Sequence, residues 1–275
     1  MRRPATRYDP TMYPPARIVC LTEETVETLY LLEEDARIVG ISGYTVRPPE
    51  AREKPKVSAF IKADIDKILA LKPDLVLAFS DLQADIVVDL IRRGVAVHAF
   101  NQRDVAGIFG MIFMLGALVD AAERAAALAD RLAAGLAQTR MRAMQLKRRP
   151  KIFFEEWDEP IISAIPWVSE LMALAGGDDI FADRRAGAAK ERIVAAPEII
   201  ARAPDIIIGS WCGKKFRPEK VAARPGFAAI PAVRDGALHE IKSALILQPG
   251  PAALTDGLAA LEKIIRDWSE RSEIR

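Results

Sequence analysis

The 275-residue sequence is poor in cysteine and histidine and carries almost no net charge. Its two cysteines, Cys20 and Cys212, are too few for a disulfide framework and too far apart for a zinc ribbon. The two histidines, His98 and His239, are distant in the chain, which disfavours zinc and predicts no resident metal. Because 39 basic residues face 38 acidic ones, no overall field draws the chain to nucleic acid.

Long apolar runs are absent as well. No stretch reaches the roughly 18 uninterrupted apolar residues of a membrane span, so we predict no membrane insertion. Residues 1–15 contain arginine, aspartate and proline but no apolar run, and we predict an N-terminal extension rather than a signal peptide. The sequence as it stands therefore predicts a cytoplasmic protein, whereas a trimmed N-terminus would make the same chain periplasmic.

What the sequence does contain is 51% hydrophobic residues and a pattern that occurs twice. Residues 68–78 and residues 199–209 each join an amphipathic helical segment, a Pro-Asp pair and a continuous apolar run. Proline and its predecessor disfavour helix, so each helix should end there. The apolar run that follows is typical of a strand buried on both faces of a parallel sheet. The repeat therefore predicts two α/β lobes.

The segment between the two halves predicts long helices. Residues 108–149 are rich in Ala, Leu, Met, Arg and Gln, the composition of helix. Residues 120–123 resemble a capping box, which indicates one helix to about Leu118 and a second from Ala121 to about Lys147. A coiled-coil dimer arm is the alternative, although the leucines of this segment keep no strict heptad. The predicted domains are an N-terminal extension (1–15), an N-terminal lobe (16–104), linking helices (105–149) and a C-terminal lobe (150–275).

This arrangement resembles the class III substrate-binding proteins of ABC importers, and most of all their cobalamin-binding branch. The resemblance covers about residues 16–268. The motifs that carry it lie at residues 39–44 and 48–49, 57–60, 71–79, 154–160 and 248–251. It implies an α/β fold of two Rossmann-like lobes with parallel sheets joined by a long interlobe helix. It also implies non-catalytic binding of cobalamin or a related corrinoid in a cleft between the lobes, as a carrier or as a receptor with an ABC permease partner.

Strand ends and the resemblance together predict the ligand contacts. A corrin ring is broad and apolar on its faces, so its site needs flat aromatic walls. Trp157 is the strongest candidate, because it follows a strand among acidic neighbours where a core tryptophan would be costly. The predicted set is Tyr44, Phe60, Phe79, Trp157, Ser163, Trp211 and Cys212. Tyr44 as an exposed side chain without a role and Phe60 as a core residue remain alternatives.

Cys212 and His239 are the residues that could touch a metal in the ligand. A thiolate ligates transition metals including cobalt, and Lys214 and Lys215 nearby would favour that form of Cys212. An unremarkable Cys212 is the alternative. Relatives of this type commonly carry an aromatic residue where this chain has residues 185–189, so that wall of the site is either missing or supplied by Trp211 or Phe216.

Two carboxylates are predicted to dock on a permease, because the importers of this family place one on each lobe. Asp66 and Glu198 fall near those positions, each shortly before a Pro-Asp strand. The alternative is that they only interact favourably with the positive ends of their helices.

Catalytic motifs are missing. Residues 209–215 look like a phosphate-binding loop but are too short and lack the Ser or Thr that holds magnesium. No nucleophile elbow or metalloprotease motif occurs, so we predict no catalytic residue and no catalytic cofactor. Haem or a ferric siderophore is an alternative ligand, for which Arg47, Arg52, Arg184 and Arg185 are available. A corrinoid-modifying enzyme that acts through Cys212 is an alternative of another class.

Overall fold

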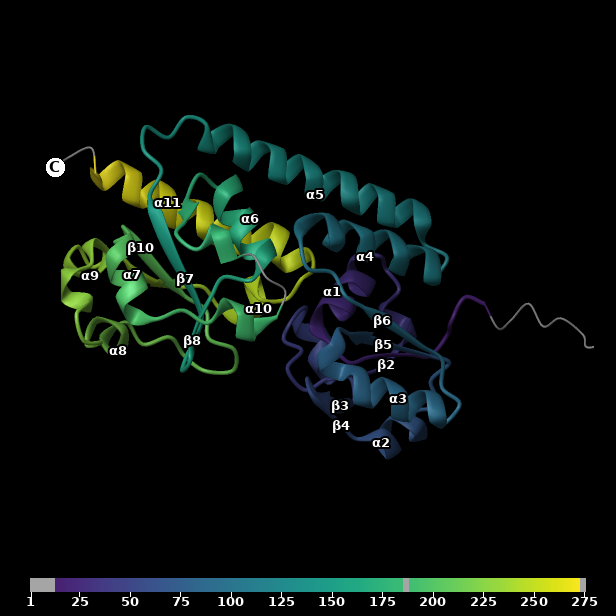
Figure 1. Cartoon of the computed structure of the whole chain (residues 1–275). Coiled ribbons are helices and arrows are strands. Elements are labelled where there is room, and N and C mark those ends of the chain that lie inside the picture. Colours follow the sequence, from purple (N-terminus) through teal and green to yellow (C-terminus); the bar gives the residue numbers. More distant parts are fainter. Residues whose placement is uncertain (1–12, 185–187, 273–275) are drawn as a thin grey trace, which may run out of the picture. The chain divides into compact units, whose positions relative to one another are not determined.

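Buried apolar runs form two mainly parallel sheets, one in each of the two units into which the chain divides (Figure 1). The computed structural model describes residues 13–184 and 188–272. Unit 1 comprises residues 1–101 and 111–128, and unit 2 comprises residues 102–110 and 129–275. The predicted α/β fold with two lobes and parallel sheets is confirmed.

Unit 1 contains a six-stranded sheet in the order β4-β3-β2-β1-β5-β6. The pairs β1–β2, β1–β5, β2–β3 and β5–β6 are parallel, whereas β3–β4 is antiparallel. The core on one face of this sheet joins strand residues such as Val19 and Val76 to Ile68, Ile86 and Leu90 of the helices. The strands are β1 (Ile18–Cys20), β2 (Ile38–Ser42), β3 (Lys56–Ala59), β4 (Lys62–Ala63), β5 (Leu75–Phe79) and β6 (Val97–Phe100), and the helices α1 (Glu23–Leu31), α2 (Ile65–Ala70) and α3 (Ala84–Arg92).

Unit 2 contains a five-stranded sheet in which β11-β10-β7-β8 are neighbours and β9 pairs with β7. The β10–β11, β10–β7 and β7–β9 pairs are parallel, and β7–β8 is an antiparallel hairpin. The strands are β7 (Lys151–Asp158), β8 (Ile161–Ser163), β9 (Asp178–Asp179), β10 (Ile206–Gly209) and β11 (Leu238–Glu240). The helices are α6 (Pro166–Leu174), α7 (Ala196–Arg202), α8 (Pro218–Ala222), α9 (Pro231–Arg234), α10 (Ser243–Ile246) and α11 (Leu258–Ser272).

Helices α4 (Val105–Leu118) and α5 (Ala122–Ala143) each contribute residues to both units. Asp120 has a φ of 59°, and the N–H of Ala121 donates to the carbonyl of Gly116 at 2.7 Å. The expectation that Asp120 caps the second helix is therefore wrong, because its left-handed backbone ends the first one. Among the described residues no helix is both long and apolar enough to span a bilayer.

The sequence did not predict the antiparallel edges. Strand β7 continues past the predicted residues 151–154 because Trp157 and Asp158 pair with Ile162 and Ile161 of β8. Trp157 consequently lies within a strand rather than on the loop that we expected.

Gly209 ends β10 against the ring of Phe216, and we predict that Gly209→Ala destabilises the protein. An added Cβ would lie 1.8 Å from Cδ2 of Phe216, so the ring must move, which costs about 1–3 kcal/mol or more. Gly135→Ala is the control, since that helical position is open and alanine there should stabilise by about 0.5–1 kcal/mol. Urea unfolding measures both, and equal stability of the two variants would contradict the packing argument.

Candidate functional site

The carboxyl ends of the parallel strands in unit 1 carry a group of aromatic and polar side chains. Open α/β sheets bind ligands at this edge. Tyr44 follows β2, is 54% exposed and donates its backbone N–H to the Ser42 hydroxyl at 3.2 Å. Phe60 follows β3, is half-buried and has a φ of 49°. These two rings are the predicted contacts in unit 1 that the structure leaves accessible.

Gln83 fixes this edge, and sequence reasoning missed it. Its buried side chain accepts the N–H of Phe79 at 2.9 Å and donates to the carbonyls of Phe60 (2.6 Å) and Leu21 (3.4 Å). Phe79 itself is only 6% exposed, which corrects the expectation of an open ring at the end of β5. A local pattern does not reveal this role of Gln83, because two of its three partners lie 23 and 62 residues away.

Two glutamates at the start of α1 are buried at the end of β1. The Thr22 hydroxyl, at the N-cap of α1, donates to Glu24 Oε1 at 2.6 Å rather than accepting a helix N–H. The Ser42 hydroxyl donates to Glu23 Oε1 at 3.3 Å. Glu24 Oε2 has no hydrogen-bond partner among the residues that the structure describes. Burial, which favours the neutral acid, raises the pKa of Glu24 from its ordinary 4.5 to about 8 and also raises the pKa of Glu23.

Trp157 lies at the corresponding edge of unit 2. Its indole N–H donates to the carbonyl of Glu159 at 2.9 Å, and Nζ of Lys214 lies 3.9 Å from the centre of its ring. Lys214 also pairs with Asp158. The ring is half-buried and held by a cation–π contact, so it forms a fixed flat surface beside a lysine.

Glu155, two residues earlier, is fully buried and holds the neighbouring loop. Arg224 donates to both of its carboxylate oxygens, at 2.5 and 2.9 Å, and the Trp211 indole N–H donates to Oε1 at 3.0 Å. Burial raises the pKa of Glu155, and Arg224 opposes that shift. Trp211 is 4% exposed and packs edge-on against Phe216 at 5.1 Å. The expectation that Trp211 presents an exposed wall is corrected, because its ring belongs to the core of the unit.

Ser163 is likewise used inside unit 2. Its hydroxyl donates to the Arg192 carbonyl at 3.1 Å, and the Arg192 guanidinium donates to the Ser163 carbonyl and pairs with Glu156. Ser163 is 1% exposed, so its hydroxyl supports the end of β8 and is not accessible as the ligand contact that we predicted. Burial raises the pKa of Glu156 as well, against the effect of Arg192.

The two metal-ligand candidates differ in accessibility. Cys212 follows β10 and is an exposed thiol, whereas His239 lies within β11, half-buried, and burial lowers its pKa. Across residues 13–184 and 188–272 no group of three His, Cys, Asp or Glu side chains is arranged to hold a metal ion.

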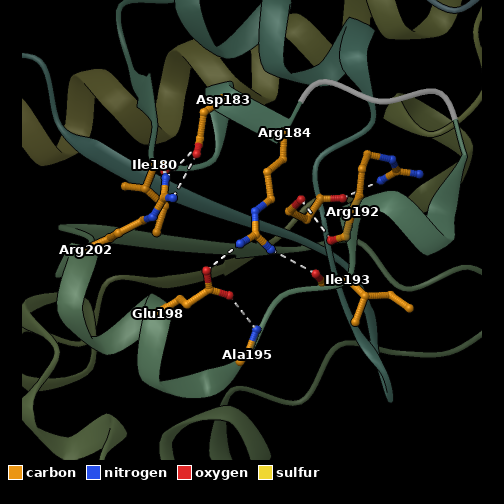
Figure 2. A network of polar contacts seen from close by, with 9 residues as sticks. Ile180, Asp183, Arg184, Arg192, Ile193, Ala195, Glu198 and Arg202 are labelled. Carbon is orange, nitrogen blue, oxygen red and sulfur yellow. Dashed lines mark hydrogen bonds and ion pairs between the residues drawn. The ribbon is translucent and has the colours of Figure 1, made fainter.

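The predicted docking carboxylates lie at helix starts, as expected, but in different settings. The side chain of Asp66, on α2, is 90% exposed and 3.9 Å from Arg93. Figure 2 shows Glu198 bound to Arg184 and accepting the N–H of Ala195 at 3.1 Å, while Arg184 also donates to the carbonyl of Ile193 at 3.0 Å. Glu198 is thus part of a network that fastens α7, and Asp66 is the more available carboxylate.

A family profile described as periplasmic binding protein matches residues 18–245. The chain belongs to this family. The predicted resemblance is confirmed.

Proteins that are similar to this chain are named after different ligands. The vitamin B12-binding protein of Vibrio cholerae serotype O1 is 27% identical over 175 residues, which cover 62% of this chain and 63% of that protein. The crystal structure of the periplasmic vitamin B12-binding protein BtuF of Vibrio cholerae is 23% identical with a TM-score of 0.74, covering 93% of this chain and 98% of that one. The periplasmic heme-binding protein RhuT from Roseiflexus sp. RS-1 is 22% identical with a TM-score of 0.78, covering 90% and 98%.

The raised pKa of Glu24 predicts that this residue makes the protein less stable as the pH rises. A folded-state pKa above the unfolded one gives stability that is complete below about pH 4.5 and is lost toward about pH 8, at up to about 1.4 kcal/mol per pH unit. Urea midpoints of the wild type and of Glu24→Gln across this range measure the effect. The difference between the two proteins should change with pH, and a constant difference would show that Glu24 titrates normally.

The ion pair between the buried Glu155 and Arg224 predicts that loss of Arg224 destabilises the protein far more than loss of an exposed arginine. Arg224→Leu leaves a buried carboxylate without its cation and should destabilise by about 3–5 kcal/mol. Adding Glu155→Gln should recover part of the loss, because the remaining group is neutral. Chemical denaturation checks this, with Arg234→Leu, at an exposed position of α9, expected to stay within about 0.5 kcal/mol. A similar loss of stability in Arg224→Leu and Arg234→Leu would refute the role of the pair.

Proposed function

We propose that this protein binds cobalamin or a related corrinoid without catalysing a reaction, as a carrier or as the receptor of an ABC importer. Support comes from the family and from relatives named as vitamin B12-binding proteins. The position of the ligand between the two units, the permease partner and the cellular compartment stay predictions.

The main supporting observation is that two of the four arginines suited to an acidic ligand already bind carboxylates, whereas Arg52 is exposed. Arg47 pairs with Glu27 at 3.1 Å, and Arg184 pairs with Glu198, while Arg185 lies outside the described residues. Unit 1 instead places two carboxyl groups, Glu23 and Glu24, at the end of β1. Such an edge suits a neutral ligand rimmed with amides, which donate hydrogen bonds, better than one rimmed with carboxylates.

The proposed contacts follow accessibility. Tyr44 and Phe60 in unit 1 and Trp157 in unit 2 offer ring faces that suit the apolar faces of a corrin. Phe79, Ser163 and Trp211 are buried and are not proposed as direct contacts. Cys212 is exposed and is proposed as a contact to the ligand, and Asp66 is proposed as a docking carboxylate for a permease, with Glu198 weakened in that role by Arg184.

Haem is the second candidate, because heme-binding structures match the fold as well as the B12-binding one does. The exposed Lys215, next in the chain to the Lys214 that pairs with Asp158, is the observation in its favour, since a propionate would pair with it.

Titration of the full chain with cobalamin, haemin and a ferric hydroxamate distinguishes the ligands, with tryptophan quenching and visible absorbance as readouts. We expect cobalamin to quench most at the lowest concentration. Trp157→Ala should weaken cobalamin binding roughly tenfold through the lost stacking surface. Trp268→Ala, another half-buried indole of unit 2, is the control and should leave affinity unchanged. Absence of tryptophan quenching at micromolar cobalamin would refute this proposal. The affinity of Cys212→Ala for cobalamin tests whether the thiol contributes to binding.

A further inference from the structure

The end of helix α5 and the segment that leads to β7 are unusually basic. Residues 140–151 contain six basic side chains and no acidic one. Because the whole chain is nearly neutral, the remainder is net acidic. The six are Arg140, Arg142, Lys147, Arg148, Arg149 and Lys151.

Only some of these charges have a structural use. Arg142 binds Glu262, at 2.8 Å through Nη2, and Arg149 binds Asp178 at 2.8 Å and the Gly177 carbonyl at 2.8 Å. Arg148 lies over the ring of Trp268 at 5.2 Å. The guanidinium of Arg140 makes no ion pair or hydrogen bond with any residue that the structure describes.

Two exposed methionines lie among these basic residues. Met141 is 61% exposed and Met144 is 73% exposed. Met141 lies in the last turn of α5 and Met144 directly follows the helix. Because they are three positions apart, their side chains share one face. Beside them is a hollow of about 510 Å³, lined by Arg140, Ala143, Met144, Arg149, Ala173 and Leu174. We call Arg140, Met141, Met144 and Arg148, together with this hollow, the α5-end surface.

The chemistry of this surface selects among partners. A second copy of the chain would bring like charges together, which disfavours self-association. Single-stranded nucleic acid needs exposed aromatic rings for stacking, whereas the exposed apolar groups of this surface are thioethers. Cations next to unbranched apolar side chains are the features that bind an anionic bilayer.

We propose that the α5-end surface docks on a lipid bilayer that carries anionic headgroups. Arg140 and Arg148 meet the phosphates, Met141 and Met144 enter the apolar boundary, and the hollow takes the upper part of an acyl chain. This contact lies wholly within unit 2 and is independent of the proposed corrinoid site.

Co-sedimentation of the full chain with vesicles tests the proposal. Vesicles of phosphatidylcholine with phosphatidylglycerol should bind the protein, vesicles of phosphatidylcholine alone should not, and added salt should weaken the binding. The double variant Arg140→Glu/Arg148→Glu should lose roughly 30-fold or more, since each basic residue near the surface contributes about 1 kcal/mol. The matched control Lys220→Glu/Arg234→Glu changes two exposed charges elsewhere in unit 2 and should bind as the wild type does.

A second pair of variants separates apolar insertion from charge. Met141→Ser/Met144→Ser should weaken binding at high salt as well as at low salt, whereas Phe113→Ser/Met114→Ser, at equally apolar exposed positions of α4, should not. Circular dichroism checks that each variant is folded. Equal binding to both kinds of vesicle, no binding to the anionic ones, or loss in the control variants would overturn the proposal. Binding of duplex DNA at the same salt, with the same loss in the α5-end variants, would reassign the surface to nucleic acid.

Discussion

Strands that are buried on both faces restrict where this protein can meet a ligand. All residues of β1, β5 and β10 are buried, so these strands present no side chain to solvent along their length. A parallel arrangement also gathers the carboxyl ends at one edge of each sheet. The polar groups that a binding protein needs are therefore concentrated at two short edges, one in each unit, where Glu24 follows β1 and Ser210 follows β10.

The two edges deal with buried charge in different ways. In unit 2 the carboxylates of Glu155 and Glu156 face Arg224 and Arg192, so desolvation is offset by ion pairing and hydrogen bonds. In unit 1, among the residues that the structure describes, no cation contributes to the raised pKa of Glu23 or Glu24, and the hydrogen bonds that lower these pKa values come from hydroxyls and backbone. The buried carboxylates of unit 2 are thus compensated by cations, whereas burial raises the pKa of both buried carboxyl groups of unit 1.

The sequence predicted those features that depend on neighbouring residues. Pro73 and Pro204 end helices locally, and the apolar runs that follow them became β5 and β10. The acidic neighbours of Trp157 correctly indicated a ring that a core could not hold. Features that depend on distant partners were not predictable. Trp211 looked like an exposed ring because nothing near it in the chain shows that Glu155, 56 residues away, binds its N–H. Arg224 was missed for the same reason, and so were the two distant partners of Gln83.

The basic segment at the end of α5 also contains both charges that are paired with carboxylates and charges that are not. Six like charges lie within 12 consecutive positions, and many of them fall within one Debye length of about 8–10 Å. Glu262 and Asp178 neutralise two of them and, in doing so, fasten α5 and the start of β7 to the rest of unit 2. The structure does not use Arg140 in this way, and the exposed Met141 and Met144 add apolar surface that water disfavours. Only a partner that is both anionic and apolar relieves both costs at once, and a negatively charged bilayer has both properties.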